Sequence, residues 1–321
     1  MMSIIGLSFL AILFLSLLVF MTSFFVGQYI HNQTLNNPEI PFLNNRGNAL
    51  WMQHQPPRQS FRFLVLGDIQ CGHSNLSRHI FQVTRGNYSF AIQTGDLMIH
   101  ADEGHYALTL HELQKSNLNV PLFVVPGNHD VNGSNPGLFD KYFTLRKFYF
   151  FWSGCLFVIL DTSSSPPYSE QFRWLEKVLE ENQTKASRTF IFMHRGPEGP
   201  VGCGEKRQRS IQKDFAPFLH VLKRFHIDYV FSGHVHDYCR SNVNGTTYIA
   251  NGAESDLEGV RVMPSYITVV EVTPEKVSDQ RVTIQASLFE SICGKTLDNM
   301  VAHIYPRLMS FGGRKRPAEK I

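Results

Sequence analysis

Asp, Asn and His side chains follow five short apolar runs of this sequence, at the point where each run ends. The residues that stand there are Asp68, Asp96, Asn128, His129, Asp130, His194, His234 and His236. Carboxylate, carboxamide and imidazole groups without thiolates suit Mn, Fe, Zn or Co rather than Cu(I) or an iron–sulfur cluster. The set is too large for one tetrahedral ion and suits two, in which case one Asp must bridge both. These residue types in this order therefore predict a centre that holds two metal ions.

Seven apolar runs, which include the five that precede these residues, predict the strands of an α/β protein. They are Phe61–Leu66, Phe90–Thr94, Leu122–Val125, Leu156–Leu160, Arg188–Met193, Tyr229–Phe231 and Thr246–Ala250, with helix-like stretches at Leu76–Thr84, His105–Leu118, Ser169–Asn182 and Ile211–Phe225. Strands that alternate with helices argue for a layered α/β sheet. Two later runs, Tyr266–Val272 and Arg281–Ala286, have no helix between them and predict an antiparallel finish.

The position of the polar residues after the strands matters more than any one of them. A single Gly-Asp after a strand is a weak signal, because turns and helix caps use the same residues. In open α/β sheets, however, sites form outside the carboxyl ends of the strands, so the five loops are expected to converge on one rim. His234 and His236 would point to opposite faces of a strand. On a loop after Gly233 they can instead both reach inward, to two different ions.

Residues from Phe61 to about Gly252 resemble the catalytic domain of calcineurin-like metallophosphoesterases. The motifs that carry the resemblance are Gly-Asp-Ile-Gln, Gly-Asp-Leu, Gly-Asn-His-Asp, Met-His-Arg and Gly-His-Val-His. The last two are also similar to segments of purple acid phosphatases. The resemblance implies an α/β fold built as a four-layer α/β/β/α sandwich. It also implies the ligands of each ion, which are Asp68, Gln70 and His236 for the first, Asn128, His194 and His234 for the second, and Asp96 as the bridge.

The same resemblance implies an enzyme, a phosphoesterase that hydrolyses a phosphate monoester or diester by attack of a metal-bridging hydroxide. It implies two divalent or trivalent cofactor ions, Mn, Fe, Zn or Mg, and places His129 at the phosphate as a candidate general acid. Asp130 is expected to orient the ring of His129. Arg195 is a candidate clamp for a phosphate oxygen, with a surface ion pair as the alternative. His73 is a candidate substrate contact or substitute ligand, with an ordinary loop residue as the alternative.

Two departures from the family pattern keep a second function open. Gln70 stands where the family usually has His, and its neutral amide oxygen is a weaker donor, so the first ion is expected to be looser or to be Mn, Mg or Fe. The three residues after Asp96 are apolar, so the iron-binding Tyr of purple acid phosphatases has no counterpart. The alternative is a catalytically weak or inactive metal-binding module that acts in binding or scaffolding. Because such a module has no use for His129, we favour the enzyme.

The N-terminal segment predicts a membrane anchor. Residues 1–38 contain no Asp, Glu, Lys or Arg, and Ile4–Val26 is almost wholly apolar. A helix of that length spans roughly 35 Å, which is enough to cross a bilayer. We therefore expect a transmembrane helix over residues 1–27, an anchor or uncleaved signal, with a cleaved signal peptide or a buried helix as alternatives. Residues 28–59 are expected to be a linker, 60–300 the metallophosphoesterase domain and 301–321 a tail.

Sequons and cysteines bear on which side of a membrane the domain lies. There are six Asn-x-Ser/Thr sequons, at Asn32, Asn75, Asn87, Asn132, Asn182 and Asn244. Chance would give about two, so the excess favours a membrane-anchored glycoprotein whose catalytic domain is extracytoplasmic or lumenal, although simple Asn richness is the alternative. The five cysteines neither demand nor forbid disulfides, but Cys203 and Cys239 could pair in an oxidising compartment.

Composition limits the partners. With 43% hydrophobic and 18% charged residues the chain is not disordered, and a net charge of +3 gives no sign of a nucleic-acid-binding surface. The expected partners are a phosphorylated small molecule, a lipid headgroup or a phosphopeptide as substrate, and a membrane through the N-terminal helix.

Overall fold

The computed structural model describes residues 40–69, 72–164, 168–197, 215–252 and 265–284, together with single helical positions at Phe14, Leu17 and Met21. Within this part of the chain, no helix has both the length and the apolar character needed to cross a bilayer. Apart from the three single positions, the anchor expected over residues 1–27 lies outside the described residues. The expected tail over residues 301–321 lies outside them as well.

The first of two mixed sheets has five strands in the order β11-β10-β1-β2-β3. Its strands are β1 (Phe61–Leu66), β2 (Phe90–Gln93), β3 (Leu122–Val124), β10 (Ser265–Val272) and β11 (Val277–Ile284). Strands β1, β2 and β3 are parallel, whereas β10 and β11 run antiparallel to their neighbours. The predicted antiparallel finish is therefore confirmed, and it forms one edge of this sheet.

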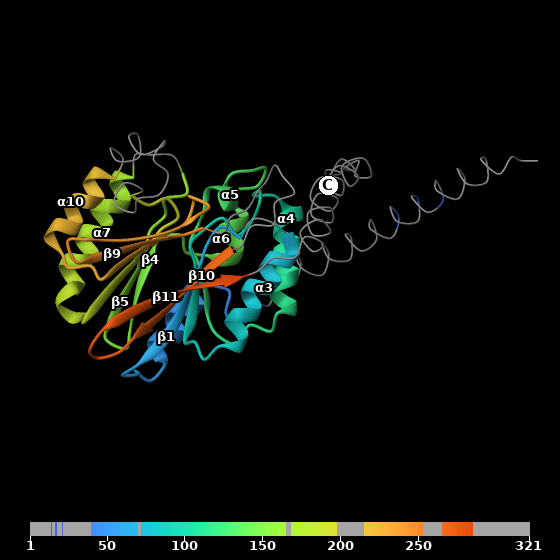
Figure 1. Cartoon of the computed structure of the whole chain (residues 1–321). Coiled ribbons are helices and arrows are strands. Elements are labelled where there is room, and N and C mark those ends of the chain that lie inside the picture. Colours follow the sequence, from blue (N-terminus) through green and yellow to red (C-terminus); the bar gives the residue numbers. More distant parts are fainter. Residues whose placement is uncertain are drawn as a thin grey trace, which may run out of the picture.

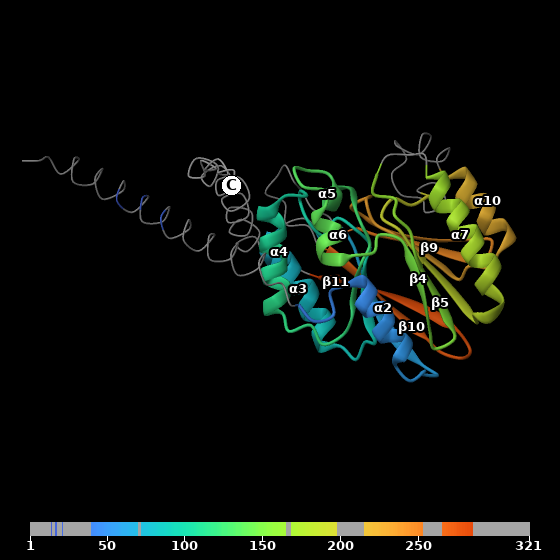
Figure 2. The same ribbon diagram turned by 180° about the vertical axis from the view of Figure 1, so that it is seen from behind.

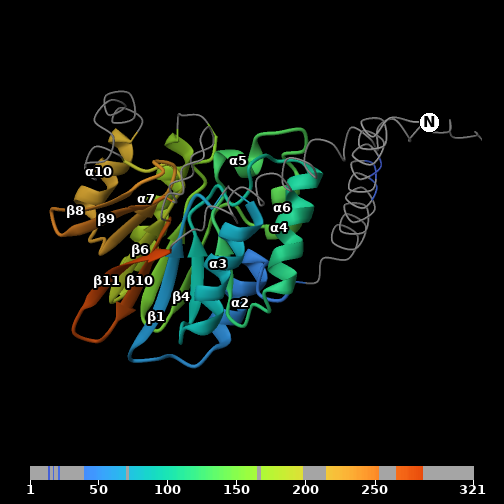
Figure 3. The same cartoon turned by 45° about the vertical axis from the view of Figure 1, so that its right-hand side comes forward.

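The second sheet has six strands in the order β4-β5-β6-β7-β9-β8. Its strands are β4 (Phe148–Trp152), β5 (Cys155–Ile159), β6 (Arg188–Phe192), β7 (Tyr229–Ser232), β8 (Tyr238–Val243) and β9 (Thr246–Asn251). The four central strands are parallel, and β4 and β8 are antiparallel edges. The carboxyl ends of the parallel strands in both sheets meet at one rim, which α5 (Asn128–Val131) marks in Figure 3.

Helices cover the outer face of each sheet, as Figure 1 shows. The helices are α3 (Gly72–Arg85), α4 (Glu103–Lys115) and α6 (Leu138–Phe143) on the first sheet, and α7 (Ser169–Asn182) and α10 (Ala216–Arg224) on the second, with a short 3-10 turn, η1 (Gln183–Lys185), after α7. One apolar cluster joins helices to sheet on each side, and a third fills the space between the sheets. The expected order of helix, sheet, sheet and helix is therefore present.

Phenylalanine side chains fill the space between the two sheets. Phe63 of β1 is fully buried there, with its ring 5.0 Å from that of Phe90 and 5.5 Å from that of Phe190 on the opposite sheet. Large rings on both inner faces hold the sheets together by burial and by edge-to-face contact. This core fixes the relative position of the strands whose ends carry the polar residues.

Residues 40–59 belong to the folded domain, so the linker expected over 28–59 is wrong for this part. The helix α2 (Asn45–His54) packs on β3 and β4, and Figure 2 shows it beside β4. The buried amide of Asn45 donates to Val124 O at 2.8 Å and accepts from Val124 N at 2.9 Å. Asn48 Nδ2 donates to Leu122 O at 2.9 Å. The two side chains thus complete the hydrogen bonds of the edge strand β3.

Asn251, at the end of β9, ties the two sheets together near the rim. Its Nδ2 donates to Val65 O in β1 at 3.0 Å, and its Oδ1 accepts from Thr268 Oγ1 in β10 at 2.9 Å. Gly67 follows β1 at the same place, where a Cβ atom would lie 2.0 Å from Asn251 O. Close approach of the two sheets at this point is what brings loops from both sheets within reach of one another.

Candidate metal centre

Two groups of possible metal ligands lie at this rim, and they share one residue. The first group contains Asp68, Asp96 and His236, and the second contains Asp96, His194 and His234. Within each group the ligand atoms lie within 4.8 Å of one another. Because Asp96 belongs to both groups, the two groups adjoin at a shared carboxylate. That they hold two ions with Asp96 as the bridge stays a prediction.

The ligand residues come from both sheets. Asp68 and Asp96 follow β1 and β2 of the first sheet, whereas His194 follows β6, and His234 and His236 follow β7 of the second. Asp68, Asp96 and His194 are at most 1% exposed, and the other two histidines are partly exposed. The centre therefore has a buried floor and an open side, which is what a site for catalysis needs.

Four of these residues have a backbone conformation that residues other than Gly rarely adopt. The φ angles of Asp68, Asp96, His234 and His236 are 45°, 56°, 71° and 53°. Such left-handed conformations cost free energy in residues other than Gly and persist only when the surrounding structure enforces them. One enforcing contact is the His234 backbone N–H, which donates to both carboxylate oxygens of Asp68 at 3.0 and 2.8 Å. This loop conformation places His234 in one ligand group and His236 in the other.

His194 is held so that one ring nitrogen faces the other ligands. Its Nδ1 donates to Thr94 O at 3.0 Å, since a carbonyl can only accept. Its Nε2 then lies 3.0 Å from Asn128 Oδ1 and 3.2 Å from Asp96 Oδ2. A backbone carbonyl behind a histidine ring is the usual way to fix the tautomer of a metal ligand. Asn128 Oδ1 therefore lies beside the second group, and its role as a metal ligand stays a prediction.

The electrostatics of the centre fit cations. Burial, and to a lesser extent Asp96, hold the pKa of Asp68 well above its ordinary range. Burial alone would lower the pKa of His194, but Asp96 and Asp68 raise it to about 9. Burial together with His194 lowers the pKa of His234 to about 3, so this ring is neutral. Without metal, protons on Asp68 and His194 offset the negative charge of these buried carboxylates. Metal ions bound to the same residues would take the place of those protons.

His129 lies beside the ligand groups without belonging to either. Its backbone N–H donates to Asp96 Oδ1 at 2.8 Å, and its Nδ1 donates to Ile99 O at 2.6 Å. Both contacts fix the residue, and only Nε2 remains to address a substrate. This placement agrees with a residue that faces the phosphate and does not bind metal.

Asp130 does not orient the ring of His129, so that expectation is wrong. One of its carboxylate oxygens accepts from Asp96 N and Gly127 N at 2.8 Å each, and the other accepts from Met98 N at 2.9 Å. The carbonyl of Ile99 holds the imidazole instead. Asp130 is fully buried and fixes the loop that carries the shared Asp96, which is a structural role.

Arg195 has no carboxylate partner among the described residues, so the alternative of a surface ion pair finds no support there. Its Nε is buried without a hydrogen-bond partner, while its backbone N and O bond to Thr162 Oγ1 at 2.9 and 3.0 Å. The guanidinium is therefore available for an anion. Gln70 and the side chain of His73 lie outside the described residues, and their expected roles stay predictions.

His100 is a neighbour of the centre that none of the sequence motifs includes. Its ring lies 6.0 Å from that of His129. The signal available in the sequence was its position four residues after Asp96, in the same loop. Asp161 accepts from Ser163 N at 3.0 Å and so stabilises its own loop.

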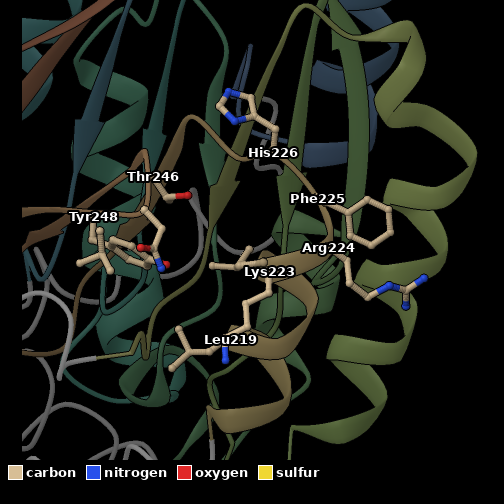
Figure 4. Close-up of a pocket in the computed structure, with 10 residues that line it drawn as sticks. Leu219, Lys223, Arg224, Phe225, His226, Thr246 and Tyr248 are labelled. Atoms are coloured by element: carbon tan, nitrogen blue, oxygen red, sulfur yellow. The ribbon is translucent and has the colours of Figure 1, made fainter.

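A separate pocket of about 580 Å³ lies at the other end of β9, where Thr246 begins that strand. Figure 4 shows Leu219, Lys223 and Tyr248 around it. None of its ten lining residues is an Asp, Glu or Cys, and none belongs to the two ligand groups. This pocket therefore does not offer the chemistry of the rim.

Comparison with known proteins agrees with this geometry. A family model described as calcineurin-like phosphoesterase matches residues 61–238. A dimetal phosphatase from Danio rerio has a similar structure, with 16% identity, a TM-score of 0.55, and coverage of 71% of this chain and 99% of that one. GAP50, the anchor in the inner membrane complex of Plasmodium, is similar at 16% identity and a TM-score of 0.55, covering 75% of this chain and 95% of that one.

A purple acid phosphatase from yellow lupin (Lupinus luteus) seeds is also similar in structure. The identity is 14% and the TM-score 0.55, with coverage of 74% of this chain and 55% of that one. No curated protein matches the sequence. At these identities the solved structures establish a common fold and no more.

Proposed function

Because this chain belongs to the calcineurin-like phosphoesterase family, we propose that it is an enzyme that uses two metal ions to hydrolyse a phosphate monoester or diester. The observation that carries the proposal is the pair of ligand groups joined by Asp96 at one rim of the sandwich. Oxygen and imidazole donors in this number suit Mn, Fe, Zn or Mg.

The residues present fit two ions. Asp68, Asp96 and His236 would hold one, with Gln70 as its expected further ligand, and Asp96, Asn128, His194 and His234 would hold the other. When bound, such ions supply positive charge to the phosphoryl oxygens and make hydroxide available near neutral pH by lowering the pKa of water.

The chain's own residues bind and orient the phosphate. His129 presents only Nε2 to the substrate, because Nδ1 donates to Ile99 O. In the imidazolium form, Nε2 donates a hydrogen bond to a phosphoryl oxygen and stabilises the charge that grows there. The guanidinium of Arg195, which follows His194 directly, would contact further phosphate oxygens in a bidentate way.

The alternative of an inactive binding or scaffolding module has no observation in its favour. Every expected ligand that the structure describes lies in or beside the two groups, and His129 is held in place by two hydrogen bonds. A module that only bound metal would have no need to fix a non-ligand imidazole in this way.

Purified protein supplied with Mn should bind about two ions and hydrolyse p-nitrophenyl phosphate or its diester. Replacing His129 by Ala should lower kcat by roughly 100-fold or more while both ions are kept, because the variant loses a phosphate contact and no ligand. Asp96→Ala should lose both metal and turnover. Metal analysis by mass spectrometry and steady-state kinetics test this, and fewer than one ion with no hydrolysis under any divalent metal would refute it.

The natural substrate is to be sought among phosphorylated small molecules, phospholipid headgroups and phosphopeptides. The loops after His194 and Gly252 that would contact it fall largely outside the described residues. A screen of the metal-loaded protein against these three classes, with cyclic nucleotides added for diesterase activity, would identify the class by the highest kcat/KM.

We further propose that the chain is a single-pass membrane protein whose domain is extracytoplasmic or lumenal. The apolar segment supports this, and its described positions Phe14, Leu17 and Met21 are exposed on a helix. Cys239 is disulfide-bonded to a partner outside the described residues, and disulfides persist in oxidising compartments. Pairing with Cys203 stays a prediction. Protease added to sealed vesicles should digest the domain only from the extracytoplasmic face, and digestion from the opposite face would exclude this topology.

The sequons differ in their suitability for glycosylation. Asn87, Asn132 and Asn244 are exposed. Asn182 is buried, and its Nδ2 donates to Val178 O at 2.9 Å, so the folded domain has no room for a sugar there. The proposal that the protein is a glycoprotein therefore rests on exposed positions such as these three.

A further inference from the structure

The rings of three histidines, His129, His100 and His105, lie next to one another beside the candidate phosphate position. The ring of His100 lies 6.0 Å from that of His129, with 35° between the planes, and 5.4 Å from that of His105, nearly perpendicular to it. His129 is partly exposed, His100 is exposed, and His105 is 4% exposed. His100 therefore stands at the open side of the centre, between a ring that faces the substrate and a ring that is buried.

The buried end of this row is anchored by a carboxylate. Asp102 caps the N-terminus of α4, where its Oδ1 accepts from His105 N at 3.0 Å. Its Oδ2 accepts from His105 Nδ1 at 2.7 Å. Burial acts to raise the pKa of Asp102, but the hydrogen bonds and charges of His105, with a contribution from His100, lower it overall. An ionised Asp102 fixes the tautomer and angle of His105, against whose ring His100 rests.

In the proposed function His129 donates to a phosphoryl oxygen, so the leaving oxygen takes its proton from another group. The reaction has phosphoryl oxygens that gain charge and a leaving oxygen that needs a proton. His129 has only Nε2 available, because Nδ1 donates to Ile99 O and the backbone N–H donates to Asp96. Among the described residues, His100 has its ring beside that of His129, with the centroids 6.0 Å apart, and its position is exposed to solvent.

We propose that His100 is the proton donor to the leaving group, with His105 and Asp102 as its positioning residues. The inference rests on the proposed phosphoesterase function. As the water oxygen forms its bond to phosphorus, it gives up one proton to solvent. The bond from phosphorus to the leaving oxygen breaks, and its electron pair stays on that oxygen. The leaving oxygen takes a proton from the His100 imidazolium, which becomes neutral and regains a proton from solvent. The substrate class this favours is phosphate esters of alcohols, whose alkoxides are poor leaving groups.

The decisive measurement compares two substrates that differ in leaving group. His100→Ala should lower kcat/KM for phenyl phosphate by roughly 100-fold, because phenoxide leaves poorly without a proton. The same variant should lower kcat/KM for p-nitrophenyl phosphate by about threefold or less, since that leaving group needs little assistance. His100→Gln, which keeps a hydrogen-bond donor but transfers no proton, should behave like His100→Ala. His220→Ala, an exposed histidine of α10, is the matched control and should leave both values unchanged.

Two further readouts separate proton donation from a structural effect. Added imidazole should restore phenyl phosphate hydrolysis in His100→Ala, because the position is exposed to solvent. Metal content and the affinity for inorganic phosphate, measured by calorimetry, should match wild type in His100→Ala, whereas His129→Ala should bind phosphate more weakly.

Equal losses on both substrates without rescue by imidazole would overturn the role of His100 while leaving an active phosphoesterase. A wild-type protein that binds metal but hydrolyses neither substrate would overturn the proposed function itself.

Discussion

At the scale of single residues, Gly127 shows how tightly the shared ligand is enclosed. A Cβ atom at this position would lie 2.1 Å from Asp96 N and 2.2 Å from Asp96 Oδ1. Gly127 N also donates to Asp130 Oδ2 at 2.8 Å, so the backbone cannot move away without breaking that bond. The glycine before Asn128 is therefore required by the space that the carboxylate of Asp96 occupies.

Replacing Gly127 by Ala should displace Asp96 and release at least one of the two ions. Overpacking of this kind also costs about 1–3 kcal/mol of stability. Metal analysis and thermal unfolding check both effects. Gly137→Ala is the control, because its nearest contact would be 3.7 Å away in an exposed turn, and it should keep both ions. A Gly127→Ala protein with full metal content would show that Asp96 is less confined than the distances indicate.

At the scale of secondary structure, the sequence predicts correctly those strands and helices whose positions follow from the burial of apolar residues. The parallel strands are continuous apolar runs, so β1 was predicted with its observed ends and the others within a few residues. The helix α7 also matched, since its spacing of Phe172, Leu175 and Val178 is the buried face. The polar strand ends then gave the candidate ligands, because the carboxyl ends of the parallel strands lie at one rim.

Sequence reasoning failed where a polar side chain replaces backbone pairing. The asparagines of α2 suggested a linker, yet Asn45 and Asn48 are buried because they bond to the open edge of β3. The half-exposed β8 has little apolar pattern and was not predicted. Asp130 was assigned to its sequence neighbour His129, but its carboxylate faces backbone N–H groups instead. Hydrogen bonds between distant segments are not encoded in local patterns.

Asn251 offers a test at this scale, because it joins elements of both sheets. Asn251→Ala removes bonds to Val65 O and Thr268 Oγ1 and leaves buried polar groups without partners. We expect a loss of about 1–3 kcal/mol in the free energy of unfolding, with weaker metal binding, because Asp68 follows β1 directly. Chemical denaturation and metal titration measure these effects.

Asn242→Ala is the matched control for that experiment. Its side chain is exposed and bonds only to Thr247 Oγ1 within the described residues, so the loss should stay below about 0.5 kcal/mol. Equal losses in the two variants would mean that Asn251 does not hold the sheets together.

At the scale of the whole molecule, the free energy of unfolding of the metal-free protein should fall as pH rises. Burial and the neighbouring Asp96 raise the pKa of Asp130 to about 6, and Asp96 raises that of His194 to about 9 in spite of burial. Both values lie above those of the unfolded chain, about 3.9 and 6.5. The stabilising contribution of each group is therefore complete at low pH and is lost as pH rises through its folded pKa.

The metal-free protein should accordingly lose stability between about pH 6.5 and pH 9, as His194 loses its proton. Below about pH 6.5 the loss from Asp130 is opposed by His234, whose pKa is lowered to about 3 and whose contribution grows as pH rises. A cation bound to His194 would replace its proton and remove this penalty, so the gain in melting temperature on adding Mn should grow over the same range. Thermal unfolding of both forms at several pH values measures this gain. If the gain in melting temperature became smaller as pH rises, His194 would not hold a proton in the buried centre of the metal-free protein.

The left-handed backbone at Asp68, Asp96, His234 and His236 has a consequence for how this sequence can drift. Each of these positions would be more comfortable with Gly, by about 1 kcal/mol or more. Replacement by Gly would relieve this strain but remove a candidate ligand, whereas other substitutions would remove the ligand and keep the strain. The four side chains are therefore held at the rim at a cost to the stability of the metal-free fold.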